Sequence, residues 1–124
     1  MRGLPFFCLA SASLYALVAM SLGVYMAASH DHVLAPAHAH LNLVGWVSVA
    51  LYGLYYHAMP AVAETRLAKI HVAAATLGVL LLAPGIALAV LGITEGVAAI
   101  GSLVTILSML LFVAVVFTNR AKAA

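Results

Sequence analysis

The chain has 124 residues, of which 67% are hydrophobic and only 6% are charged. A soluble domain carries about a quarter charged residues, so this composition excludes a water-soluble protein and indicates an integral membrane protein. The net charge of +2 is too small to favour nucleic-acid binding, and a single cysteine excludes an intrachain disulfide.

Four apolar segments are each long enough to cross a bilayer, which takes about 20 residues in a helix. They run over residues 4–28, 38–59, 68–91 and 96–118. The polar connections between them are short, and short connections make neighbouring helices antiparallel. We therefore predict an all-α fold, in which residues 1–124 form a single transmembrane domain built as a four-helix unit.

The basic residues predict the orientation, because Lys and Arg accumulate on the cytoplasmic side of a membrane protein. If the N-terminus lies inside, all of the basic residues lie inside with it: Arg2, Arg66, Lys69, Arg120 and Lys122. The opposite side then carries Asp31, Glu95 and a cluster of histidines. The expected topology is N-in and C-in, in a bacterial inner membrane, with the histidine cluster facing the periplasm.

The stretch from His38 to Pro60 begins with two histidines, His38 and His40, at the start of an apolar segment. Neutral imidazole is a good ligand for heme iron, copper and zinc. Two residues turn a helix by about 200°, so the two rings point in nearly opposite directions. They are poorly placed to bind one metal together and well placed to bind two centres, one on each side of the helix. The alternative is that both are interfacial histidines bonded to water and loop backbone.

A second group of candidate ligands lies in the connection before this segment. His30, Asp31 and His32 stand close in sequence to His38 and His40. Imidazole and carboxylate groups bind copper and zinc, so these residues could form a metal site in a flexible loop on the outer side. The spacing of this group is not diagnostic of either metal.

Asn42 and Gly53 are candidates for a supporting role around a cofactor. An amide near His40 can hydrogen-bond across helices or orient a ligand. Gly53 leaves room for a flat cofactor or for another helix, and plain helix packing is the alternative. His57 and His71 lie about 25 Å of helix from His40 and near loops, so we interpret both as structural.

The second and third segments resemble the tenth and eleventh helices of subunit I of the heme-copper oxidases. The tenth helix of that family opens with His-x-His and continues with a glycine, a histidine and a proline at the spacing found here in His38, His40, Gly53, His57 and Pro60. The next helix of the family begins near Lys-Ile-His, followed by a glycine and a proline at the spacing of Lys69, Ile70, His71, Gly78 and Pro84. The second segment also resembles, more loosely, the nitric oxide reductase branch.

The resemblance implies that His38 is the ligand of an active-site heme, that His40 is the ligand of a low-spin heme, and that His71 is not a heme ligand. The chain departs from the family in having one arc of four helices, where the family's subunit has three such arcs. The family's copper ligands have no counterpart either, because the chain has no adjacent pair of histidines. A full oxygen-reducing centre is therefore not expected.

Three copies of a four-helix arc would form a closed ring, and closed cyclic oligomers are common among proteins. In a homotrimer, His40 of one copy and His38 of the next can face each other across heme b. A dimer with one shared heme is the competing arrangement. We therefore expect a small b-type cytochrome for electron transfer or gas binding.

Two other functions compete with the cytochrome. One is a periplasm-facing membrane protein that binds copper or zinc without heme, and the other is a structural subunit whose histidines only pack. The sequence leaves open whether the protein is also an oxidoreductase and which redox partner it has.

Overall fold

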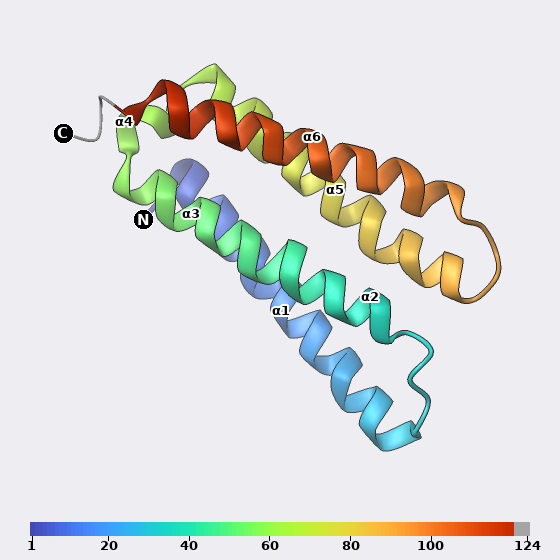
Figure 1. Cartoon of the computed structure of the whole chain (residues 1–124). Helices are drawn as coiled ribbons and strands as arrows, with labels where there is room; N and C mark the ends of the chain where they lie inside the picture. Colours follow the sequence, from blue (N-terminus) through green and yellow to red (C-terminus); the bar gives the residue numbers. More distant parts are fainter. Residues whose placement is uncertain (121–124) are drawn as a thin grey trace.

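The computed structural model describes residues 1–120, and every regular element in that range is helical. The helices form two antiparallel hairpins (Figure 1). The all-α fold predicted from the sequence is confirmed. Lys122, which contributed to the predicted orientation, lies outside the described residues.

The first hairpin begins with α1 (Gly3–Ser29), which ends where His30 adopts a left-handed conformation with a φ angle of 59°. The chain returns through α2 (Ala35–His40), a π-helical segment η1 (Leu41–Val47) and α3 (Ser48–Ala58). These three elements run end to end, because the residues at both junctions have helical backbone angles. Together they form the second rod of the bundle.

The second rod differs from the helix predicted over residues 38–59 in two respects. It begins at Ala35, because Pro36 suits the first turn of a helix, where its missing N–H is not needed. It also changes to π-helical winding directly after His40. There the N–H and the hydroxyl of Ser48 both reach the carbonyl oxygen of Leu43, the hydroxyl at 2.7 Å. Such winding is often found at functional sites.

A short helix, α4 (Pro60–Ala63), leads into the second hairpin, which consists of α5 (Arg66–Val90) and α6 (Gly96–Thr118). Helix α5 begins just before the predicted start at residue 68, because the Thr65 hydroxyl accepts a hydrogen bond from the Ala68 N–H at 3.2 Å. A side chain that accepts from the first turn in this way stabilises a helix start.

Glycines bring the backbones of α5 and α6 into direct contact. A Cβ atom at Gly101 would lie 2.6 Å from the backbone nitrogen of Leu82, and one at Gly85 would lie 2.6 Å from that of Ala98. Since real Cβ atoms do not approach backbone so closely, only glycine fits at these two positions. Small residues allow the same close approach between helices in many membrane proteins.

The four rods follow one another in an open row. Helix α1 packs mainly against η1 and α3 and makes a few contacts with α5. Helices α2 and η1 pack against α5, and α6 packs chiefly against α5. Helices α1 and α6 therefore form the two outer edges of the unit (Figure 1). Both edges carry exposed apolar side chains, among them Leu14, Leu17, Leu103 and Leu110.

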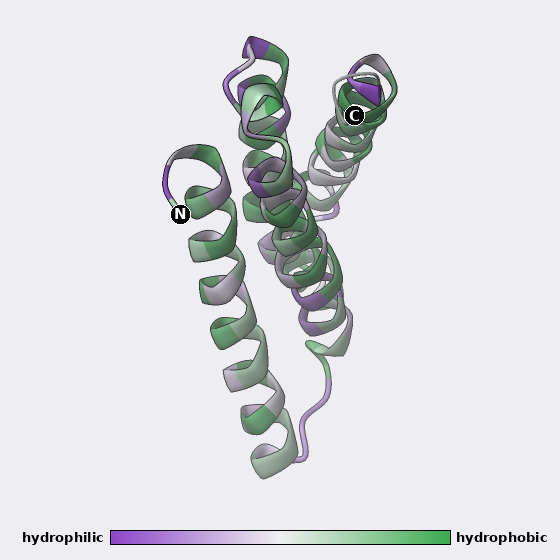
Figure 2. Ribbon diagram, turned by 90° about the vertical axis from the view of Figure 1, so that its left-hand side faces the viewer, coloured by the Kyte–Doolittle hydropathy of each residue, from purple (hydrophilic) through white to green (hydrophobic). Residues whose placement is uncertain are grey.

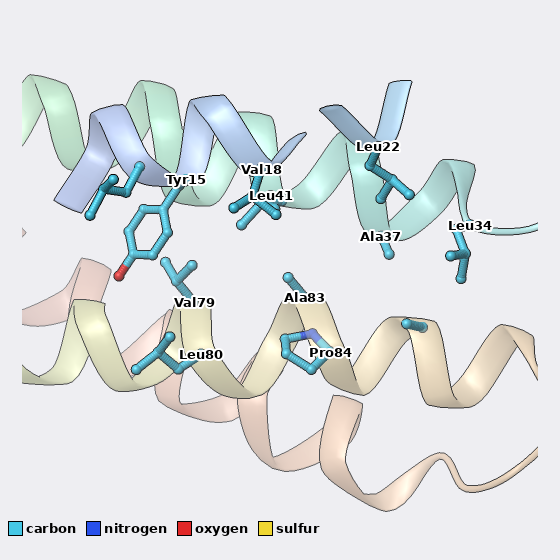
Figure 3. Close-up of a pocket in the computed structure, with 12 residues that line it drawn as sticks. Tyr15, Val18, Leu22, Leu34, Ala37, Leu41, Val79, Leu80, Ala83 and Pro84 are labelled. Atoms are coloured by element: carbon cyan, nitrogen blue, oxygen red, sulfur yellow. The ribbon is translucent and has the colours of Figure 1, made fainter. Parts of the chain in front are cut away.

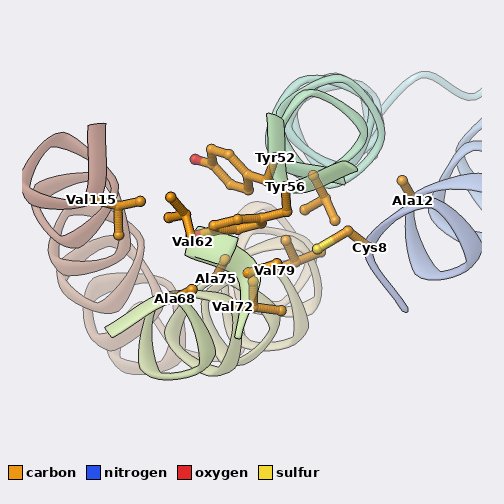
Figure 4. Packing of buried hydrophobic residues seen from close by; sticks show 12 residues of the cluster. Cys8, Ala12, Tyr52, Tyr56, Val62, Ala68, Val72, Ala75, Val79 and Val115 are labelled. Atoms are coloured by element: carbon orange, nitrogen blue, oxygen red, sulfur yellow. The ribbon is translucent and has the colours of Figure 1, made fainter. Parts of the chain in front are cut away.

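The two hairpins share a core near the end that holds α4 and the start of α1 (Figures 1 and 4). Tyr52 and Tyr56 of α3 project toward α5 and α6 in the centre of this core, and Cys8 of α1 closes one side. Small residues of α5 such as Ala68 and Ala75 leave room for the two tyrosine rings. The core therefore fixes the two hairpins to each other at this end of the bundle.

Three helices, α1, α5 and α6, are long and apolar enough to cross a membrane. Hydrophilic residues gather mainly toward the ends of the rods (Figure 2). The basic residues within the described range lie at the end with the N-terminus and α4: Arg2, Arg66, Lys69 and Arg120. The chain is therefore a multi-pass membrane protein with one basic end.

Candidate functional site

His38 lies half-buried between α2 and α1. Its Nδ1 atom is 2.7 Å from the carbonyl oxygen of Ala19 on α1. Because a carbonyl oxygen only accepts hydrogen bonds, Nδ1 carries the proton and donates it, which leaves the lone pair of the neutral ring on Nε2. The ring packs over Gly23, where a Cβ atom would come within 3.0 Å of the imidazole Cε1. Helix α1 thus fixes both the tautomer and the direction of this ring.

His40 lies on the exposed side of α2. Its Nδ1 atom is 2.8 Å from the carbonyl oxygen of Pro36, one turn earlier in the same helix. The same argument places the proton on Nδ1 and the lone pair on Nε2. Within residues 1–120, neither His38 nor His40 makes a hydrogen bond through Nε2. Histidines that bind metals commonly donate their other ring N–H to a backbone carbonyl in this way.

The two rings diverge, as their spacing in the sequence predicts. His38 faces α1, whereas His40 faces out of the unit. In the described part of the chain, no three side chains of His, Cys, Asp or Glu come together in a group that could hold a metal ion. Each imidazole therefore offers one ligand atom, and a complete coordination shell needs a second contributor.

Contacts within the chain account for the presence of Asn42 and Gly53. The Asn42 amide donates to the carbonyl oxygen of His38 at 3.2 Å, so it supports the backbone at His38. At Gly53, a Cβ atom would lie 3.0 Å from both Cys8 Cβ and Leu9 Cγ of α1. Gly53 therefore allows α3 to pack closely on α1. This contact agrees with the helix-packing interpretation of Gly53, which was the alternative to room for a flat cofactor.

The candidate ligands in the connection between α1 and α2 are exposed and do not gather. The Asp31 carboxylate accepts from the N–H of Val33 at 3.1 Å, and the Asp31 N–H donates to the hydroxyl of Ser29 at 3.2 Å. These bonds shape the turn after α1. Within the described range, a copper or zinc site made of His30, Asp31 and His32 is thus not assembled.

The other two histidines lie toward the basic end of the bundle. His57 is exposed near the end of α3. His71 of α5 is fully buried, with its Nδ1 at 2.8 Å from the hydroxyl of Tyr56. Its ring stacks on Phe112 with centroids 5.0 Å apart and meets the edge of Tyr52 at 4.5 Å. These contacts agree with a structural role for His71.

Removal of the Tyr56 hydroxyl is expected to destabilise the protein. Nε2 of His71 is buried without a partner among the described residues, so Tyr56→Phe would leave both ring nitrogens unpaired. A buried polar group that loses its partner costs about 1 kcal/mol in a membrane protein. Unfolding in mixed detergent, followed by circular dichroism, measures the loss. Tyr55→Phe is the control, and equal losses in both variants would contradict the role assigned to this hydrogen bond.

An apolar cavity of about 440 Å³ lies between α1, α2 and α5 (Figure 3). Tyr15 and Leu22 of α1 line it from one side, and Val79 and Pro84 of α5 line it from the other. Its size falls within the range of about 300–1,000 Å³ that is common for ligand pockets. None of the residues that line it is a histidine, so the cavity offers apolar surroundings and no metal ligand.

The contribution of α1 to the histidine site was not predicted from the sequence. Buried Ala12, Ala16 and Ala19 are followed by Gly23, which places small residues three or four apart along one face of α1. This face receives the second rod, and its last two members hold His38. The signal is present in the sequence as small residues at helical spacing.

Comparison with protein-family models, with curated proteins and with solved structures finds no match. The resemblance to the heme-copper oxidases is therefore carried by motif spacing alone. A functional proposal therefore depends on the positions of His38 and His40 and on their bonds to backbone carbonyls.

Proposed function

We propose that the protein is a small membrane b-type cytochrome, related to subunit I of the heme-copper oxidases, in which His38 and His40 bind heme at one edge of the membrane. One observation carries the proposal: each ring donates Nδ1–H to a backbone carbonyl and so keeps Nε2 as a ligand atom. Iron with two histidine ligands is low-spin and suits electron transfer. Binding of a diatomic gas is the other candidate function, and it requires one of the two histidines to leave the iron.

The proposed assembly is a closed ring of identical copies, with three copies favoured over two. His40 points out of its own unit, so its heme takes the second ligand, His38, from the next copy. The open row of helices supports this arrangement, because its edges, α1 and α6, carry exposed apolar side chains that a neighbouring copy can cover. A closed ring pairs one edge of each copy with the other edge of the next.

The proposed location is a bacterial inner membrane, with the histidine end facing the periplasm and both termini inside. The basic residues in the described range support this orientation, since all of them lie at the end opposite the histidine pair. Heme bound by His38 and His40 would then lie near the outer surface, within reach of a redox partner on that side.

The proposal is tested by substitution of each ligand. His38→Ala and His40→Ala are each expected to abolish the reduced-minus-oxidised Soret difference of protein purified from heme-replete cells. His57→Ala is the matched control, because His57 is an exposed histidine at the other end of the same rod. Copper or zinc in the purified wild-type protein without a Soret band, or full heme content in both alanine variants, would refute the proposal.

A second variant separates ligand position from ligand loss. Gly23→Leu keeps both histidines but places a side chain where the His38 ring lies, since even a Cβ atom there approaches Cε1 to 3.0 Å. We expect heme affinity to fall by about tenfold or more, as for other changes behind a metal ligand. Heme titration of the apoprotein gives the affinity, and an unchanged value would show that α1 does not position His38.

A further inference from the structure

A second concave surface lies at the basic end of the bundle, between the first turns of α1 and the first half of α5. This groove has a volume of about 390 Å³ and is walled by apolar residues that include Leu4 and Phe7 of α1 and Leu77 and Leu80 of α5. Lys69 is the one charged residue that lines it. The groove is separate from the histidine pair, which lies at the other end of the molecule.

We propose that this groove binds one acyl chain of an anionic phospholipid, whose phosphate group contacts the ammonium of Lys69. The charge of this end supports an anionic headgroup. Arg2, Arg66 and Arg120 lie at the same end as Lys69, and Glu64 is the one acidic residue there in the described range. Basic groups at the membrane surface attract anionic lipids, and a lysine side chain can extend along apolar surface to reach a headgroup.

The length of the groove fits one leaflet of a bilayer. From Lys69 to Leu80 the rise along α5 is about 16 Å, and half of a hydrocarbon core is about 15 Å thick. The charged group thus lies at the depth of the headgroups when the apolar end of the groove lies near the middle of the membrane.

The walls of the groove suit a hydrocarbon chain. Apart from Lys69 and Thr76, its lining residues are apolar. The Thr76 hydroxyl, which also lines the groove, is bonded to the Val72 carbonyl oxygen at 2.9 Å and leaves the wall effectively apolar.

The test compares two phospholipids with identical acyl chains, phosphatidylglycerol and phosphatidylcholine, by native mass spectrometry of the delipidated protein. We expect retention of phosphatidylglycerol to exceed that of phosphatidylcholine by about fivefold, the factor that one basic residue contributes at a membrane surface. Lys69→Gln is expected to lower this ratio severalfold while phosphatidylcholine is still retained. Ala73→Leu, which fills the groove, is expected to lower the retention of both lipids severalfold.

Two controls separate the groove from general effects. Arg120→Gln removes a cation at the same end but outside the groove, and Ala99→Leu adds the same side chain at an exposed position of α6. Both controls are expected to bind lipid as the wild type does. Equal retention of the two lipids by the wild type, or an unchanged ratio in Lys69→Gln, would overturn the proposal. A dimer that Ala73→Leu abolishes, with no lipid retained, would also overturn it.

Discussion

Coexpression of His38→Ala and His40→Ala copies is expected to restore about a quarter of the wild-type heme content, although neither variant alone is expected to bind heme. In the proposed ring, each heme takes His40 from one copy and His38 from the next. When the two variants mix at random, about one interface in four joins a copy that retains His40 to a next copy that retains His38. The heme-to-protein ratio of the purified mixture measures the recovery, and native mass distinguishes a trimer from a dimer.

This experiment tests the sharing of ligands between copies separately from heme binding itself. Two copies of His40→Ala under different tags are the control and should stay free of heme. If both ligands of a heme came from a single copy, no mixture of these variants would regain it. A heme-loaded monomer in detergent would likewise contradict the shared site while leaving heme binding itself intact.

Gly101→Ala is expected to lower the free energy of unfolding by about 2 kcal/mol. Its Cβ atom would lie 2.6 Å from the backbone nitrogen of Leu82, so α5 and α6 must move apart. Overpacking of this kind costs about 3 kcal/mol, and the better helix propensity of alanine returns about 1 kcal/mol. The steric term therefore prevails. Unfolding in mixed detergent, followed by helical circular dichroism, gives the change.

Gly96→Ala is the matched control on the same helix. A Cβ atom at Gly96 would meet nothing closer than the Thr94 hydroxyl, at 3.6 Å, which is an ordinary contact. This variant should therefore be as stable as the wild type or slightly more stable. A similar loss in both variants would show that the cost arises from the loss of glycine itself and not from the contact between α5 and α6.

The sequence was sufficient to predict the helical class and the approximate extent of the long helices. Hydrophobic runs of membrane length leave few alternatives, because backbone groups in lipid must be hydrogen-bonded within the helix. Helix ends were less predictable, since they depend on single residues. Pro36 moves the start of the second rod to Ala35, and Thr65 sets the start of α5. The π-helical winding of η1 has no signal in hydrophobic periodicity.

The candidate site was predictable where it depended on local geometry. The divergence of His38 and His40 follows from two residues of helical rotation, and the structure has the same arrangement. Contacts between helices were not predictable, because they depend on how the rods pack. The bond from His38 to the Ala19 carbonyl and the burial of His71 beside Tyr56 belong to this group.

The π-helical segment η1 divides the second rod into two halves with different contents. On one side, α2 carries the histidines, and on the other, α3 carries the tyrosines that hold the hairpins together. A residue gained or lost within 41–47 would turn the histidines about the axis without repacking the tyrosines. A change of length in this segment can therefore redirect His38 and His40, and it requires new packing of Leu41, Val44 and Trp46, which lie against the core.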